Sequence, residues 1–442
     1  MRSSRKFGCL LLLFSPAVIY GQTADAADSK ELIRALLNRI DQLEKRVADL
    51  ESHSATAAAP APQNAPAVPN PPAPQDQLAV VQPPPEQAPE APPQPAPPPR
   101  MTGEHPGMTG VMPAMHLQGF SDFNFSATDQ PHTHSGFSEG QFVLHVYSQL
   151  SQKVSYFGEL SFTARTDAGL GSPPAPGFNA EVERSIIRFD ENDYFKVSFG
   201  RYHTPINWWN MTFHHGAWLQ TTVSRPEMVQ FGGSFLPIHF VGALVEGAFP
   251  ANGLNLNYNI GIGNGRSSVI NRSGDWGDIN NNRAWLVTVF SRPSRLYGFQ
   301  VGGSVYRDLI TPALSNKAYR EWIESGHIVW QKENPEIIAE FSNVTHQQVD
   351  TSLISNSQAW YVQMAYRLPW FERLWKPYYR FEYIHIPLSD PLFRLVPTLA
   401  GSTVGVRYDI SSFAALKFEW RNQRRPGDLR VNGVFAQTSF TF

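Results

Sequence analysis

From about residue 115 to the C-terminus, apolar and polar residues alternate along the chain in runs of about ten positions. In the clearest run, Leu254, Leu256, Tyr258, Ile260 and Ile262 alternate with asparagines and glycines. Successive side chains of a strand point to opposite faces, so this run gives one strand an apolar and a polar face. An apolar face toward lipid and a polar face toward a wet lumen is typical of transmembrane barrels. The pattern therefore predicts membrane-spanning β-strands.

Sixteen such runs can be placed in residues 115–442, and the intervals between them alternate in length. We expect the strands to start near residues 116, 136, 153, 179, 194, 240, 253, 282, 297, 320, 335, 356, 375, 398, 414 and 430. Connections after even-numbered runs are mostly short and those after odd-numbered runs mostly long, with 367–375 the exception. Short turns at one end and long loops at the other are typical of outer-membrane barrels. We therefore expect an all-β fold, a 16-stranded antiparallel transmembrane β-barrel.

The first residues have the three parts of a secretory signal. Arg2, Arg5 and Lys6 form a basic start, residues 7–20 are apolar, and small residues follow. We expect a signal peptide over residues 1–26, because the apolar run is shorter than a membrane span. Cys9, the single cysteine, lies inside it, so the mature chain would have neither a disulfide nor a thiolate zinc site.

Residues 29–53 carry a heptad repeat with apolar a and d positions, which predicts a coiled-coil helix. The segments 39–44 and 46–51 each read Arg, apolar, two other residues, apolar, Glu, and resemble the trimerisation motif of parallel coiled coils. A single amphipathic helix packed on another element is the alternative. The expected trimerisation residues are Ile33, Leu36, Arg39, Ile40, Leu43, Glu44, Arg46, Val47, Leu50 and Glu51.

Residues 54–114 form a linker that we expect to be extended and without a core, because Pro, Ala and Gln dominate its first part. Its end is rich in thioethers and imidazoles, soft ligands that suit copper. The weak metal candidates are Met101, His105, Met108, Met112, Met115 and His116. A flexible linker that happens to contain methionine is the simpler interpretation, so we expect no metal and no cofactor.

Charge and hydropathy narrow the class of protein. The net charge is -2 and no basic stripe dominates, so nothing indicates a nucleic-acid partner. The mean hydropathy of -0.30 excludes a protein built of many membrane-spanning helices.

The longest connection, residues 205–239, is the candidate pore constriction. It holds Trp208, Trp209, His214, His215 and Arg225, and its charges lean basic. Basic side chains that line a narrow pore favour anions, whereas pairing with lumen glutamates would cancel that preference. The further arginines expected in the lumen are Arg165, Arg184, Arg188, Arg201, Arg380, Arg407 and Arg421.

The order coiled coil, linker and barrel resembles the phosphate-selective porin family and its dicarboxylate-porin relatives. The local resemblance is the run 197–205, which ends in a Gly-x-x-x-Thr-Pro pattern, Gly200 to Pro205, before the long loop. The resemblance implies a 16-stranded trimeric barrel whose loop after strand 5 forms the constriction, with a ladder of lumen arginines and a lysine cluster. Lysines are sparse in this barrel. The C-terminal Phe440 and Phe442 resemble the signal that barrel-assembly machinery reads.

The expected function is therefore passive diffusion of small hydrophilic solutes through an outer-membrane porin of a Gram-negative-type bacterium, with phosphate or small carboxylates as candidate solutes. The expected partners are outer-membrane lipid, two further copies in a homotrimer and the barrel-assembly machinery, with peptidoglycan as a candidate. Two alternatives remain: an envelope tether through the periplasmic extension, and copper handling by the Met/His segment. No Ser–His pair with an orienting carboxylate is evident, so we do not expect an enzyme.

Overall fold

The computed structural model describes residue 45 and residues 113–442, except for 165–177, 214, 231–234, 250–252, 267, 269, 271–279, 314–316, 394–395 and 426–428. The signal peptide and linker predicted from the sequence lie outside the described residues, as does the coiled coil apart from Lys45. The architecture below concerns the unit Gly103–Phe442.

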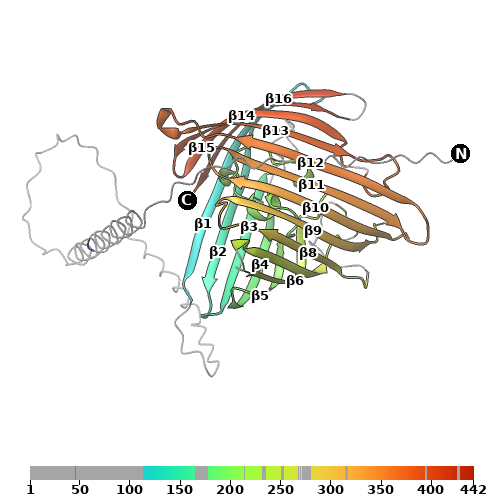
Figure 1. Ribbon diagram of the computed structural model, residues 1–442. Helices are drawn as coiled ribbons and strands as arrows, with labels where there is room; N and C mark the ends of the chain where they lie inside the picture. The colour runs from blue at the N-terminus through green and yellow to red at the C-terminus, as the bar shows by residue number, and fades with distance from the viewer. Residues whose placement is uncertain are drawn as a thin grey trace, which may run out of the picture. The chain divides into compact units, whose positions relative to one another are not determined.

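The unit is a closed antiparallel barrel in which each strand pairs with its neighbours in the sequence (Figure 1). Pairing of the first and last strands closes it, with Phe120 opposite Thr441. The strands are β1 Met115–Thr128, β2 Gly136–Gln149, β3 Val154–Ala164, β4 Phe178–Asn192, β5 Phe195–His203, β6 His239–Phe249, β7 Leu256–Asn264, β8 Ala284–Ser291, β9 Phe299–Ile310, β10 Tyr319–Gln331, β11 Glu336–Gln348, β12 Ile354–Ala365, β13 Trp375–His385, β14 Leu399–Ser411, β15 Ala414–Arg424 and β16 Arg430–Thr441. The predicted fold class and the sixteen strands are confirmed, and each start lies within about three residues of its prediction.

The barrel exposes apolar side chains on its outer face. On β7, Ile260 and Ile262 are 48% and 58% exposed, whereas Asn259, which precedes Ile260, is 8% exposed. On β15, Phe418 is 51% exposed while Glu419 beside it is 3% exposed. The alternation therefore turns apolar residues outward and polar residues inward, the opposite of a water-soluble sheet and typical of a barrel surrounded by lipid. Among the helices that the structure describes, none is long and apolar enough to cross a membrane.

Connections differ in length at the two ends of the barrel. Even-numbered strands lead into short turns such as 150–153, 193–194 and 412–413, at what we term the turn end. Odd-numbered strands lead mostly into longer segments at the opposite, loop end, of which 204–238 is the longest; the connections 349–353 and 425–429 are shorter. The predicted exception remains, because residues 366–374 form a longer turn that includes the short helix η4, Phe371–Arg373. This arrangement brings the long connections to one mouth of the barrel.

Replacing Ile260 with arginine should destabilise the folded barrel by about 2–4 kcal/mol, because the charge would face lipid near mid-membrane. Asn257→Arg, on the inner face of the same strand, should cost much less. Urea unfolding of both variants in lipid vesicles, followed by tryptophan fluorescence, measures the difference. Equal costs for the two variants would contradict the assignment of the faces.

Candidate functional site

Residues 204–238, termed the inner loop, leave β5 and return to β6 after passing through the interior of the barrel. The loop contains three short helices, α2 Trp209–Phe213, η1 Ala217–Leu219 and η2 Glu227–Val229. Helix η1 contacts β1 and β16, while other parts of the loop hydrogen-bond to β11, β13 and β15. The inner loop therefore spans the lumen from one wall to another.

The Gly-x-x-x-Thr-Pro run determines how the chain enters the lumen. Gly200 has a φ of +140°, and a Cβ atom there would lie 1.9 Å from the carbonyl oxygen of Ser185. Only glycine fits this close approach of β5 to β4. Thr204 is fully buried, and its backbone N–H donates to the carbonyl oxygen of Ile238 at 2.8 Å. The two ends of the inner loop are thus tied together where the hairpin opens.

Apolar side chains of the inner loop form a core inside the barrel. Trp209 and Phe235 have no exposed surface. The Trp209 ring meets Tyr361 of β12 edge-on at 6.1 Å between ring centroids, and Phe235 lies 5.4 Å from Phe393. The wall contributes inward apolar residues to the same cluster: Ile323, Val329, Ile338, Val344 and Ala359. Burial of this surface favours the docked position of the loop.

Carboxylates of the wall accept hydrogen bonds from the backbone of the inner loop. Glu340 accepts from the N–H groups of Trp208 and Trp209 at 2.8 and 2.7 Å. Glu419 accepts from the N–H of Val223 at 3.0 Å and from the hydroxyl of Ser224 at 2.7 Å. Glu382 accepts from the N–H of Glu227 at 2.7 Å. Each bond gives a partner to a loop N–H or hydroxyl group that would otherwise lose its water.

Cations of the wall donate to the carbonyl oxygens of the same loop. Arg380 donates to the carbonyl oxygens of Ser224 and Arg225 at 2.8 and 3.2 Å. Arg407 donates to those of Trp218 and Gln220 at 2.6 and 2.9 Å. Lys417 donates to the carbonyl oxygens of Ala217 and Thr222. The guanidinium and ammonium groups therefore act as anchors for the backbone of the inner loop.

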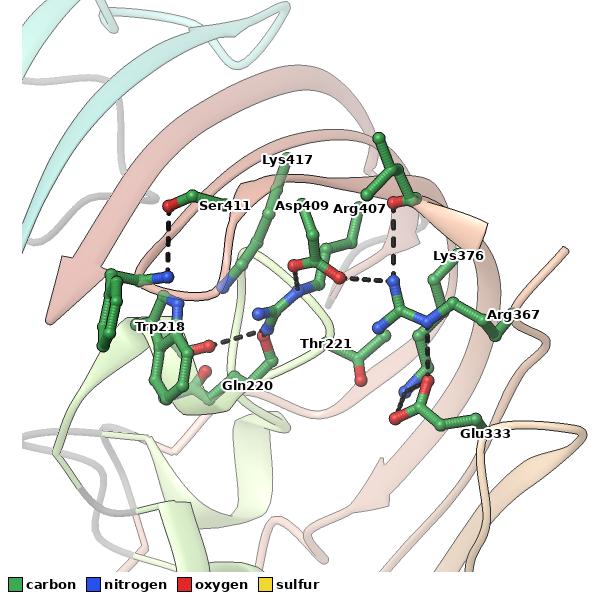
Figure 2. A network of polar contacts seen from close by, with 12 residues as sticks. Trp218, Gln220, Thr221, Glu333, Arg367, Lys376, Arg407, Asp409, Ser411 and Lys417 are labelled. Carbon is green, nitrogen blue, oxygen red and sulfur yellow. Dashed lines mark hydrogen bonds and ion pairs between the residues drawn. The ribbon is translucent and has the colours of Figure 1, made fainter. Parts of the chain in front are cut away.

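An ion-pair chain links these anchors to the turn end of the barrel (Figure 2). Asp409 bridges Arg407 and Arg367, and Arg367 also pairs with Glu333 at 2.8 Å. Lys376 contacts Glu333 at 3.2 Å. Lys376 also pairs with Glu336 at 2.7 Å, and Glu336 accepts a hydrogen bond from the hydroxyl of Thr221 in the loop. The loop is thus held to the turns that precede β11 and β13.

Histidines and glutamates surround the base of the inner loop. His239 of β6 and His215 of the loop both contact Glu183 of β4, at 2.8 and 3.1 Å. His203 of β5 lies 3.6 Å from Glu159 of β3. In the described part of the chain, no group of three or more such side chains is arranged to hold a metal ion. These pairs place imidazole rings against carboxylates of β3 and β4 where the inner loop leaves β5 and returns to β6.

A second buried network lies at the loop end. Arg266, which follows β7, pairs with Glu321 of β10 at 2.9 Å. His346 of β11 bridges Glu321 and Asp390 at 3.0 and 2.9 Å. Burial alone would raise the pKa of Asp390, but hydrogen bonding to His346 outweighs it and lowers the pKa. The network draws the β7–β8 and β13–β14 connections against the wall.

A cavity of about 250 Å³ lies between the start of the inner loop and the wall from β5 to β10. Its polar lining includes Lys196, Asn257, Asn259, Thr288, Glu246, Arg292, Gln300 and His327. Arg292 donates to Gln300 at 2.9 Å and lies 4.9 Å from the centre of the Phe290 ring. No carboxylate forms an ion pair with Arg292 among the described residues, and partial burial lowers its pKa. Arg292 is thus a cation that faces a polar cavity.

The residues expected to line the lumen have different environments. Trp209 and Arg380 are fully buried, and Arg225 is 6% exposed, so these side chains offer almost no surface to a solute. Trp208 borders the cavity, whereas Arg165 and His214 lie outside the described residues.

Most of the expected lumen arginines have carboxylate partners. Arg184 pairs with Glu159, Arg188 with Asp190 and Glu246, Arg201 with Glu181, Arg380 with Glu382, Arg407 with Asp409 and Arg421 with Glu419. These arginines are therefore paired with carboxylates, which was the alternative given for the lumen charges, and do not form the open ladder that the resemblance implied. Sequence reasoning missed Arg292, because a single arginine in a turn carries no pattern.

Of the other expected sites, Met115 and His116 begin β1, while the remaining Met/His candidates and all the trimerisation residues lie outside the described part. Phe440 stacks against Phe123 of β1 at 6.3 Å and also contacts the Phe442 ring. Their role in barrel assembly stays a prediction.

The pKa of Glu333 makes the turn-end ion pairs sensitive to acid. Burial would raise this pKa, but Lys376 and Arg367 outweigh it and lower the pKa below its usual 4.5. The stabilisation is therefore complete above pH 4.5 and is lost as the pH falls through the lowered value. Glu333→Gln should lower the free energy of unfolding by under about 1 kcal/mol at pH 7, because Glu333 is half-exposed. The urea midpoints of Glu333→Gln and wild type should become equal as the pH is lowered. A difference between the two midpoints that persists at low pH would contradict the role of the Glu333 charge. Glu372→Gln, in an exposed turn, is the control.

Among known proteins, only solved structures resemble this barrel in the comparisons made by family, by sequence and by structure. No family model matches the sequence, and no curated protein matches it. An anion-selective porin from Comamonas acidovorans superposes with a TM-score of 0.54 at 11% identity, covering 75% of this chain and 100% of that one. The outer membrane channel DcaP of Acinetobacter baumannii gives 0.51 at 12% identity, with 75% and 97% covered. At such identities the likeness shows the fold alone, so the chain has the barrel fold of these outer-membrane channels.

Proposed function

We propose that this protein is an outer-membrane porin through which small hydrophilic solutes diffuse passively. The observation that carries the proposal is the inner loop, which is fastened inside a closed barrel beside a polar cavity. A barrel whose outer face is apolar belongs in a membrane, and a polar interior offers solutes a route across it. The membrane channels with the same fold support the proposal.

The inner loop would act as the constriction of the pore. Most of the wall side chains that hold its backbone lie on β11–β15, whereas the cavity lies on the β5–β10 side. A solute would therefore pass along the β5–β10 side, past α2. The anchors keep the loop backbone in place, so that the width of the route stays constant.

The proposal also includes a preference of the pore for anions. The paired arginines on the wall contribute little net field, since each has a carboxylate nearby. Arg292 and Lys196 line the cavity, where Glu246 is paired with Arg188 and Lys196 lies 3.9 Å from Asp193. A guanidinium without a carboxylate partner in a narrow polar passage favours anions such as phosphate or small carboxylates.

The N-terminal segments would complete the assembly. The heptad repeat would join three chains, and the Pro-rich linker would carry it into the periplasm. Tether and copper-handling functions rest mainly on residues outside the described part of the chain, so the barrel supports the porin more directly.

Conductance in a planar lipid bilayer tests the proposal. The purified protein should open channels that close in three equal steps, as a trimer would. A folded protein that produces no conductance would show that the inner loop seals the lumen, and the porin function would be rejected.

Arg407→Gln should loosen the inner loop, because the carbonyl oxygens of Trp218 and Gln220 lose their donor. We expect a larger or noisier single-channel conductance from a barrel that still folds, as judged by heat-modifiable gel mobility. Arg373→Gln, at an exposed turn, is the control. If the conductance of Arg407→Gln equals that of wild type, this anchor does not set the width of the pore.

Arg292→Gln should shift the reversal potential in a KCl gradient toward the value for cations, because it removes the cation from the cavity. Arg295→Gln, in the same turn but outside the cavity lining, controls for the general loss of charge. If the reversal potential shifts equally in the two variants, the anion preference depends on the net charge of the protein and not on the cavity.

A further inference from the structure

A cluster of arginine and tryptophan lies on the outer face of the barrel, near the loop end. Cross-strand pairing places Trp285 of β8, Arg307 of β9 and Trp322 of β10 in one row. Arg320, opposite Leu309, belongs to the next row toward the loop end, and Arg283 precedes Trp285 by two residues. We term Arg283, Trp285, Arg307, Arg320 and Trp322 the Arg–Trp patch.

The alternation of each strand shows that the patch points away from the lumen. Tyr306 and Asp308, the neighbours of Arg307, are 0% and 2% exposed and face inward. Glu321 and Ile323 flank Trp322 and are buried in the same way. Side chains between such pairs must take the opposite face of the wall.

One aromatic ring of the patch contacts its central cation. The Arg307 guanidinium lies 5.7 Å from the centre of the Trp322 ring, and the Trp285 and Trp322 rings meet edge-on at 5.6 Å. Among the described residues, no carboxylate forms an ion pair with Arg307 or Arg320. Glu324 lies one row further from the loop end, opposite Val305. The patch is therefore positively charged and partly ordered before anything binds.

The position of the patch relates it to the membrane surface. Toward the turn end, the outward residues that follow are mostly apolar: Val287, Val289, Val301, Val305 and Ile328. Tryptophan is enriched where the apolar band of a barrel ends and the headgroups begin. The arginines of the patch thus lie at headgroup level, directly above a surface that acyl chains can cover.

We propose that the Arg–Trp patch binds the phosphate groups of a phosphorylated glycolipid of the lipid A type in the outer leaflet. The proposal rests on the membrane placement given under the proposed function. Guanidinium groups match phosphate geometry with two donors each, and they lie next to apolar wall for the acyl chains. A soluble anion would gain nothing from that wall, so the observations favour a lipid over free phosphate.

Retention of lipid A by the purified full-length protein tests the patch. Wild type and variants in detergent would be mixed with diphosphorylated or monophosphorylated lipid A and analysed by native mass spectrometry. Wild type should retain the diphosphorylated form more strongly than the monophosphorylated one. The double variant Arg307→Gln with Arg320→Gln should retain at least tenfold less of the diphosphorylated form.

Arg430→Gln is the matched control, because Arg430 is also exposed near the loop end of an outer face but has no aromatic ring partner among the described contacts. It should retain lipid A as wild type does. Equal retention by wild type and the double variant, or equal losses in the double variant and in Arg430→Gln, would overturn the proposal.

Conductance separates this inference from the porin function. The double variant should conduct as wild type does, because neither arginine touches the lumen. If wild type binds lipid A but does not conduct, the porin function fails and the lipid site stands. If wild type conducts but retains no lipid A, only the lipid site is rejected.

Discussion

A loop that runs inside a barrel must find hydrogen-bond partners for its backbone. That requirement governs this structure. A loop in the lumen loses much of its water, and its N–H and C=O groups then need partners. Here the wall supplies both kinds. Glu340, Glu382 and Glu419 accept from loop N–H groups, while Arg380 and Arg407 donate to loop carbonyl oxygens. Docking of the loop follows from this complementarity as much as from its apolar core.

The same pairing decides the electrostatics of the interior. Charges that would line an open channel are committed to the loop or to one another, as for Arg421 with Glu419. The cavity on the β5–β10 side therefore takes its polar character from other residues, such as Arg292 and Lys196. Under the proposed porin function, one or two of the many arginines would therefore set the selectivity.

The outer face obeys a different constraint, since lipid admits charge only at the headgroups. Arg307 meets that constraint because the Trp322 ring lies beside its guanidinium at the edge of the apolar band. Inner and outer faces of one strand consequently serve separate purposes: β9 presents Asp308 to the buried network and Arg307 to the membrane surface.

Alternation with a period of two, short turns and long loops determined the barrel, its strands and the site of the inner loop, because these follow from local patterning. The sequence also singled out the glycine of the run 197–205. It did not show why glycine is needed there, which is the close approach of Gly200 to Ser185. The tertiary structure alone decided which charges meet. Arg184 pairs with Glu159 across two strands, and Arg380 reaches Ser224 from a distant strand. The alternation of apolar and polar residues did not predict inward apolar residues such as Ile323 and Val344. These side chains pack against the loop and not against lipid. Pairing across long sequence separations depends on how the barrel closes, which no local pattern records.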